Sequence, residues 1–101
     1  MVTDKISLIK ALQDNRERIL HFGVTRLGVF GSFVRNEMND KSDVDFLVEF
    51  KTGKKTYKNY IHLLYLIENL TGRKIDLATE ESLAERIKSK ILKETENVFE
   101  A

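Results

Sequence analysis

One segment constrains the fold more than the rest of the chain. Residues 43–50 alternate with a period of two: Asp43, Asp45 and Leu47 fall on one side, and the apolar residues Val44, Phe46 and Val48 fall on the other. This is the period of a β-strand, in which successive side chains point to opposite faces of the sheet. The pattern predicts a strand that packs one face against a hydrophobic core and carries two carboxylates on the other.

Glycines, helix caps and changes of hydrophobic period divide the remaining sequence, which contains no proline. Apolar residues at helical spacing predict one helix from Thr3 or Asp4 to Gly23, and a β-prone run predicts a strand over residues 25–30. A short helical turn is expected at residues 33–37, followed by a polar loop at residues 39–42.

The second half of the chain contains another long helix and a third strand. A cap at Thr56 and a stop at Gly72 delimit this helix. Residues 74–78 form a short strand by length and alternation, and Thr79 opens a last helix that runs toward Phe99. The order predicts an α+β fold with a small mixed β-sheet of about three strands flanked by helices. A length of 101 residues suits one hydrophobic core, so we expect residues 1–101 to form a single domain.

Composition limits the functions open to the chain. Seventeen basic and sixteen acidic residues give a formal charge of +1, so no global field favours nucleic acid or an anionic membrane as the partner. The absence of cysteine removes disulfides, thiolate metal sites and a cysteine nucleophile. The N-terminus lacks the apolar region of a signal peptide, and no apolar run approaches the ~18 residues of a membrane span. We therefore expect a cytoplasmic protein.

Asp43 and Asp45 point to a bound cation. Two carboxylates on one face of a strand repel each other unless a cation or water screens them. Magnesium suits this position because it takes oxygen ligands and leaves coordination positions for substrate phosphates. Asp76, in the third predicted strand, would join them if that strand lies beside residues 43–50 and Asp76 faces the same side.

A second element lies where the first predicted strand ends. Gly31 lets a phosphate approach the backbone closely, and the N–H groups of Gly31 and Ser32 favour anions. Arg35, one turn farther on, places a guanidinium near the same phosphates. We call residues 31–36 the Gly-Ser turn. Together with the carboxylates it supplies what phosphoryl or nucleotidyl transfer needs: oriented donors, metal ligands and positive charge.

Each of these elements alone has a simpler explanation. A lone Gly-Ser is almost always just a turn, and a lone Asp-x-Asp is more often a solvated strand edge or part of a calcium loop than a catalytic pair. What favours the functional interpretation is the ordered combination: a strand, Gly-Ser, a short polar segment, then Ser-Asp-x-Asp followed by Phe-Leu-Val.

Residues 31–35 and 42–48 resemble the active-site motif of the DNA polymerase beta-like nucleotidyltransferase superfamily, in particular its minimal nucleotidyltransferase branch. The resemblance implies the palm fold of that superfamily and ATP as the nucleotide donor. It also implies two Mg²⁺ ions bound by three catalytic carboxylates, those of Asp43, Asp45 and Asp76. The nucleotide would be bound by four further residues: Gly31, Ser32, Arg35 and Ser42.

One position departs from the family motif. Asn36 stands where many members have glycine. Asparagine tolerates a left-handed backbone better than most residues, so we expect the turn to survive with some strain. The departure concerns the geometry of the turn and leaves the metal site unaffected.

The resemblance also implies an acceptor. Stand-alone minimal domains of this family are commonly encoded with a HEPN toxin, a ribonuclease, and act as antitoxins by transferring AMP to a tyrosine of that partner. A protein acceptor is expected here because 101 residues leave no room for the helical domain with which larger nucleotidyltransferases recognise their acceptors. Two alternatives stay open: an antitoxin that only occludes its toxin, and a nucleotidyltransferase that acts on RNA or a small molecule.

The helix predicted between Thr56 and Gly72 carries two apolar stripes. The first is a core stripe of Tyr60, Leu63, Leu64, Ile67 and Leu70, and the second consists of Tyr57, Ile61 and Tyr65. The simpler explanation is that both stripes pack inside a small domain. The alternative is that the second stripe is a surface for a partner or for self-association as a homo- or hetero-oligomer. The exposure of these side chains discriminates between the two.

Overall fold

The computed structural model describes residues 2–39 and 41–100, so Asp40 of the predicted loop at residues 39–42 lies outside the described residues. The elements follow in this order: α1 (Lys5–Asp14), α2 (Arg16–Leu20), β1 (Val24–Phe30), the 3-10 turn η1 (Gly31–Phe33), β2 (Val44–Phe50), α3 (Tyr57–Thr71), β3 (Ile75–Ala78), the 3-10 turn η2 (Glu80–Ser82), α4 (Glu85–Glu94) and β4 (Glu96–Glu100). No helix among the described residues is both long enough and apolar enough to span a bilayer.

The strands form one mixed sheet in the order β3-β2-β1-β4. β1 is antiparallel to both β2 and β4, whereas β2 is parallel to β3 and is connected to it through α3. The predicted α+β class, the mixed sheet and the strands near residues 25–30, 43–50 and 74–78 are confirmed. The described sheet has four strands, one more than the sequence indicated.

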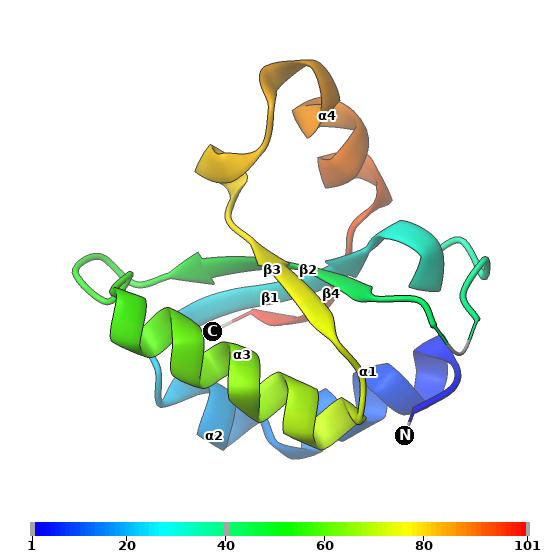
Figure 1. Ribbon diagram of the computed structural model, residues 1–101. Helices are drawn as coiled ribbons and strands as arrows, with labels where there is room; N and C mark the ends of the chain where they lie inside the picture. The colour runs from blue at the N-terminus through cyan, green and yellow to red at the C-terminus, as the bar shows by residue number, and fades with distance from the viewer. Residues whose placement is uncertain (1, 40, 101) are drawn as a thin grey trace.

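The core lies on one face of this sheet, which α1, α2 and α3 cover (Figure 1). Val44, Phe46 and Val48 of β2 are buried there, as the alternation predicts. They belong to one cluster with buried residues of β1 and the helices: Leu8, Leu12, Leu27, Val29, Leu63 and Ile67. Each fully buried side chain of this size stabilises the fold by about 1.5–3 kcal/mol. Asp45 and Leu47 therefore project from the opposite face, which we call the open face, and α4 and η2 stand above it (Figure 1).

The helix predicted from residue 3 to Gly23 is in fact two helices. Asp4 caps α1, as predicted, because its carboxylate accepts the backbone N–H of Ser7 at 2.8 Å. The break falls at Asn15, between α1 and α2. Its side-chain amide donates to the carbonyl of Ala11 at 2.8 Å, a local hydrogen bond that competes with a continuous helix.

The prediction of one last helix from Thr79 toward Phe99 was wrong in two places. η2 starts at a cap in which the Ser82 hydroxyl accepts the N–H of Thr79 at 3.2 Å and donates to its carbonyl at 2.7 Å. It ends after three residues, because the backbone of Leu83 is extended. α4 then ends at Glu94, and the following residues form β4 against β1. Val98 in β4 is only 3% exposed, so burial of apolar side chains in the sheet prevails over continuation of the helix.

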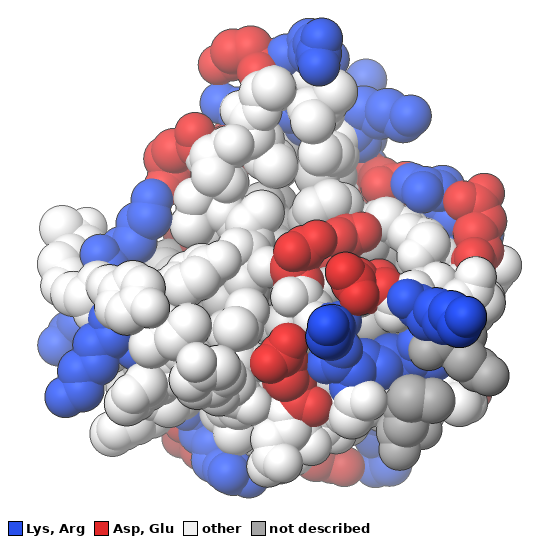
Figure 2. Space-filling view, viewed as in Figure 1, with Lys and Arg blue, Asp and Glu red and all other residues white. Residues whose placement is uncertain are grey.

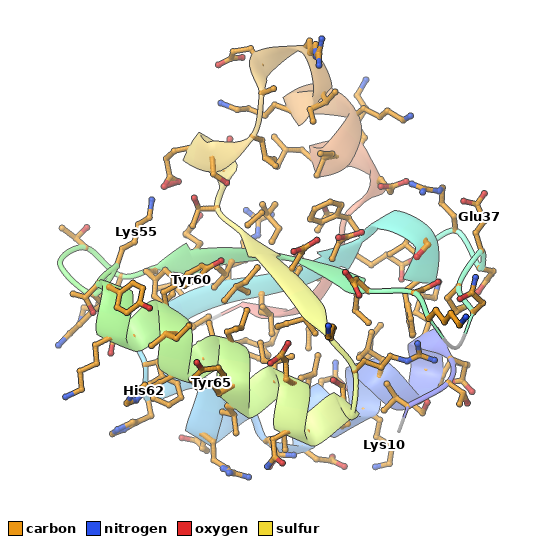
Figure 3. All side chains as sticks on the ribbon, in the orientation of Figure 1. Lys10, Glu37, Lys55, Tyr60, His62 and Tyr65 are labelled. Atoms are coloured by element: carbon orange, nitrogen blue, oxygen red, sulfur yellow. The ribbon has the colours of Figure 1, made fainter. Side chains whose placement is uncertain are left out.

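α3 runs from the cap at Thr56 to Gly72, as predicted. Its core stripe contains the buried Leu63 and Ile67, but the second stripe does not pack inside: Tyr57 is 79% exposed and Tyr65 is 60% exposed. Figure 3 shows Tyr65 on the outer surface of this helix. The simpler explanation of the second stripe is therefore wrong for its two tyrosines.

Candidate active site

Three carboxylates lie together on the open face because of the strand register. In the parallel pair of β2 and β3, Asp45 is the direct partner of Asp76, so both side chains point to the same side of the sheet. Asp43 lies two residues before Asp45, immediately ahead of β2. The condition set for Asp76 by the sequence therefore holds. Acidic side chains gather near the centre of the view in Figure 2.

Asp45 is the carboxylate most affected by its surroundings. Its partial burial raises its pKa, and the negative charges of Asp76 and Asp43 raise it further. Arg35 offsets part of this effect. A cation would relieve the repulsion that remains, so this group of carboxylates is an environment suited to a divalent metal ion.

Gly31 begins the Gly-Ser turn directly beside Asp45. The last residue of β1, Phe30, is paired with Asp45, and Gly31 follows it with a backbone φ of +79°. A Cβ atom on Gly31 would lie 2.2 Å from Oδ2 of Asp45. Only glycine tolerates both the positive φ and the lack of space for a Cβ atom. It also brings the backbone of the turn into contact with the carboxylate of Asp45.

The short helical turn expected at residues 33–37 begins two residues earlier, as η1 at Gly31–Phe33, and residues 34–36 continue as a turn. The carbonyl of Gly31 accepts the N–H groups of Val34 and Arg35, at 3.1 and 3.2 Å, and the carbonyl of Ser32 accepts the N–H of Glu37 at 2.9 Å. Asn36 adopts a left-handed conformation with a φ of +58°. This is the conformation for which glycine is the usual residue, and asparagine sustains it here.

Arg35 projects from the turn and is held by two carboxylates. Its Nε donates to Glu37 at 2.8 Å, at the outer edge of the turn (Figure 3). Its Nη1 donates to Oε1 of Glu94, the last residue of α4, at 2.5 Å. The other oxygen of Glu94 accepts the backbone N–H of Gly31 at 3.0 Å. Burial opposes the charged form of Glu94, but the hydrogen bonds from Arg35 and Gly31 outweigh it and lower the pKa of this carboxyl.

Ser42 has a structural partner in the loop that precedes β2. Its hydroxyl accepts the N–H of Asn39 at 2.8 Å, and its own N–H donates to the carbonyl of Asn39 at 3.0 Å. These bonds close the loop just before Asp43. A nucleotide-binding role for Ser42 stays a prediction.

Arg73 connects this loop to the Gly-Ser turn. Its guanidinium lies 4.8 Å from the centre of the Phe33 ring and donates to the carbonyls of Asn39 and Ser42, at 3.0 and 3.3 Å. Its Nε donates to the carbonyl of Val2 at 2.7 Å. Only 6% of Arg73 is exposed. A buried guanidinium with this set of acceptors fixes the position of both segments that bear the candidate site.

A groove of about 280 Å³ lies between the Gly-Ser turn and α4. On one side it is lined by Phe30, Gly31, Arg35 and Asp45, and on the other by four residues of α4: Ile87, Lys90, Ile91 and Glu94. The groove thus joins the turn that would bind phosphate to a carboxylate that would bind metal.

The donor atoms at this site fit magnesium in their chemistry. Within residues 2–39 and 41–100, no three side chains of His, Cys, Asp or Glu gather closely enough to hold one ion by themselves. Magnesium is usually bound by one or two carboxylates together with water and substrate phosphates, rather than by a cage made only of protein. The paired Asp45 and Asp76, with Asp43 beside them, can supply such ligands next to a turn suited to phosphate.

Sequence reasoning missed Glu94, Lys90 and Arg73. Glu94 and Lys90 belong to the predicted last helix, in which no motif marks them, and their position at the site depends on the pairing of β4 with β1. Arg73 follows directly after Gly72 in a stretch with no motif. The one signal it offered was a charged residue between a helix stop and a strand that carries a candidate ligand.

Fold and site together define a nucleotidyltransferase, because phosphates bound at the turn after β1 would lie beside the carboxylates of β2. The comparison with known families agrees. Residues 7–98 match the family described as the nucleotidyltransferase domain, and the chain belongs to this family.

Similarity to individual proteins indicates which nucleotidyltransferases this chain resembles. The chain is 43% identical over 79 residues to the protein adenylyltransferase MntA of Thermococcus cleftensis, covering 78% of this chain and 76% of the relative. It is 39% identical over 81 residues to a candidate protein adenylyltransferase of Methanocaldococcus jannaschii, covering 80% of this chain and 86% of the relative. The chain is thus an enzyme of the nucleotidyltransferase class, similar to proteins named for the transfer of AMP to protein.

Solved structures share the fold. One, described as a candidate minimal nucleotidyltransferase, superposes with a TM-score of 0.73 at 33% identity and covers 93% of this chain and 95% of its own. A toxin-antitoxin structure with AMP-PNP gives a TM-score of 0.68 at 13% identity, covering 88% and 73%. A complex of tri-AMPylated Shewanella oneidensis HEPN toxin with MNT antitoxin gives 0.62 at 11% identity, covering 92% and 73%. The last two likenesses concern the fold alone.

Proposed function

We propose that this chain is a magnesium-dependent antitoxin that transfers AMP from ATP to a tyrosine of a HEPN-family ribonuclease toxin. Support comes from relatives named protein adenylyltransferases and from the shared fold of an MNT antitoxin in complex with an AMPylated HEPN toxin. An AMP-PNP complex of the same fold supports ATP as the donor.

The observation that carries the proposal is the register of Asp45 and Asp76 beside Gly31. The carboxylates are cross-strand partners on the open face, and Gly31 leaves no room for a Cβ against Asp45. A triphosphate at the Gly-Ser turn would therefore approach these carboxylates closely. Asp43, Asp45 and Asp76 would hold magnesium, which supplies Lewis acidity to the phosphates and to the attacking hydroxyl.

The chemical step is an in-line displacement at the α-phosphorus of ATP. The tyrosine hydroxyl oxygen forms a bond to this phosphorus, and the bond from phosphorus to the bridging oxygen of the β-phosphate breaks. Pyrophosphate leaves with that oxygen, and the hydroxyl proton passes to a carboxylate of the site. Asp76 is suited to accept it because it is exposed on the open face, where an acceptor side chain can approach.

The test is a transfer assay with radioactive ATP labelled at the α-phosphate. The purified chain is incubated with magnesium and with the product of the neighbouring gene or another HEPN-family toxin. We expect label on the toxin, on a tyrosine located by mass spectrometry, and loss of labelling on removal of magnesium. A stable complex that inhibits the toxin without label would replace the proposal with occlusion. Label on added RNA or small molecules only would replace it with another acceptor.

Matched variants connect the activity to the site. Asp45→Asn and Asp76→Asn are expected to reduce transfer at least about a hundredfold, because each removes a charge that holds the metal. Asp14→Asn changes an exposed aspartate of α1 that pairs with Lys10, and we expect it to transfer AMP normally. Normal transfer by Asp45→Asn would contradict the assignment of the active site to these carboxylates.

A further inference from the structure

Glu94 binds the groups that a substrate phosphate would use. Its two carboxylate oxygens accept the Gly31 N–H at 3.0 Å and the Arg35 guanidinium at 2.5 Å. A backbone N–H at a glycine and an arginine form the usual binding set for a phosphate oxygen pair. Glu94 is therefore an anion in an anion-binding position, and only 15% of its side chain is exposed.

Glu94 and a phosphate cannot use this position together. The Gly31 amide has one hydrogen to donate, and Glu94 receives it in this structure. The Nη1 of Arg35 likewise already donates to Glu94 in this structure. Binding of a phosphate at Gly31 therefore requires that Glu94 leave.

The element that carries Glu94 is built so that it can move at low cost. α4 has ten residues, all of them described, and none of them is buried. Ile87 and Leu92 are 41% and 39% exposed. A helix of this length draws its stability from packing, and the packing here is slight, so few contacts oppose its displacement.

We propose that Glu94 occupies the place of a substrate phosphate at the Gly-Ser turn in the nucleotide-free protein, and that the nucleotide displaces it together with the C-terminal end of α4. The inference rests on the proposed function, because it assumes that nucleotide phosphates bind at this turn. Displacement frees Arg35 for the phosphate, and Lys90, which lines the same groove, then faces the incoming charge. Glu94 thus lowers the affinity for nucleotide by competing for its site.

The experiment compares two glutamates that share Arg35. Glu94→Gln removes the charge that holds the Gly31 amide. Glu37→Gln removes an equal charge from the same guanidinium but leaves Gly31 untouched. The binding of inorganic triphosphate and of ATP is measured by calorimetry at one ionic strength, and circular dichroism verifies that each variant is folded.

Glu94→Gln is expected to bind triphosphate about tenfold more tightly than the wild type, which equals about 1.4 kcal/mol. Glu37→Gln is expected to change the affinity by less than about twofold, because it alters only an exposed ion pair. Equal affinity in Glu94→Gln and the wild type would overturn the inference while leaving the proposed function intact. An equal gain in both variants would overturn it as well, since charge alone would then explain the effect.

A measurement on the unaltered chain covers the case in which a variant does not fold. Triphosphate is titrated into the wild-type protein while the backbone amide signals of Gly31 and of the α4 residues Lys90 and Ile91 are followed by NMR. We expect all three signals to move with one binding curve. Movement of Gly31 without α4 would contradict the displacement of Glu94. Failure of every protein to bind triphosphate or ATP would remove the proposed function and the inference with it.

Discussion

At the scale of single residues, the negative charge of Asp45 serves metal binding in the proposed function but destabilises the folded protein. Its pKa is raised by burial and by the charges of Asp76 and Asp43. The folded state consequently holds this proton more tightly than the unfolded chain does. The contribution of Asp45 to the free energy of unfolding therefore falls as the pH rises from the ordinary aspartate pKa of 3.8 through the raised value.

Asp45→Asn should therefore stabilise the fold at neutral pH while it abolishes transfer. We expect a gain of up to about 1 kcal/mol, since like charges on neighbouring strands are destabilising and the open face is partly solvated. Urea unfolding at a series of pH values measures this gain, which should shrink toward pH 4. A variant less stable than the wild type at pH 7 would show that the carboxylate has favourable partners in the free protein.

At Gly31, the geometry of the candidate site restricts the residue type to glycine. Gly31→Ala should destabilise the fold both through its positive φ and through the contact of the new Cβ with Asp45. Gly53 is the matched control, with a φ of +82° and no atom near an added Cβ, so Gly53→Ala should cost only about 1 kcal/mol. Unfolding measurements should give a larger loss for Gly31→Ala.

A double-mutant cycle separates the two causes. In an Asp45→Ala background the carboxylate is gone and only the Cβ at position 45 stays 3.3 Å from the new Cβ, so the cost of Gly31→Ala should fall most of the way to that of Gly53→Ala. An undiminished cost in that background would mean that the contact with Asp45 does not explain the need for glycine.

At the scale of elements, Arg73 joins three segments that the sheet alone does not connect. The residues before α1, the loop before β2 and the Gly-Ser turn all contact its guanidinium. Arg73→Met keeps most of the apolar stem but removes the guanidinium's hydrogen bonds to three part-buried carbonyls, which should destabilise the fold by about 3 kcal/mol. Arg73→Lys should recover part of this loss, because an ammonium reaches fewer of the carbonyls.

Urea unfolding of these variants is best compared with Arg86→Met, at an exposed position of α4. That change should alter the free energy of unfolding by less than about 0.5 kcal/mol. Equal stability of Arg73→Met and Arg86→Met would mean that other contacts hold the loop and the turn.

The elements that were predicted correctly have local sequence signals that mark where they begin and end. β2 has a strict alternation, and α3 has a cap at Thr56 and a stop at Gly72. The C-terminal region was not predictable in this way. Residues 96–100 are a strand because they pair with β1 about seventy residues earlier in the chain, and no local pattern records that pairing.

At the scale of the whole molecule, one face of the sheet packs against the core and the other carries the candidate active site. The core lies between the sheet and the helices α1, α2 and α3, whereas α4 stands above the open face (Figure 1). The side chains of Asp45 and Asp76 point to that open face. Asp43, Asp45 and the turn were predictable because a short motif contains them, whereas Asp76 was assigned by its place in the third predicted strand. Glu94 and Arg73 were not, because each reaches the site from a distant part of the sequence.

Because β4 pairs with β1, the sheet is complete only after β4 has been synthesised. β1 and β2 leave the ribosome early, whereas Glu94 and β4 follow only after α3 and β3. Contacts so distant in sequence form late because a long loop must close first. Until then β1 has an unpaired edge, and the Gly31 amide lacks Glu94. A nascent chain would therefore expose its Gly-Ser turn, and Glu94 would reach the Gly31 amide only as β4 docks.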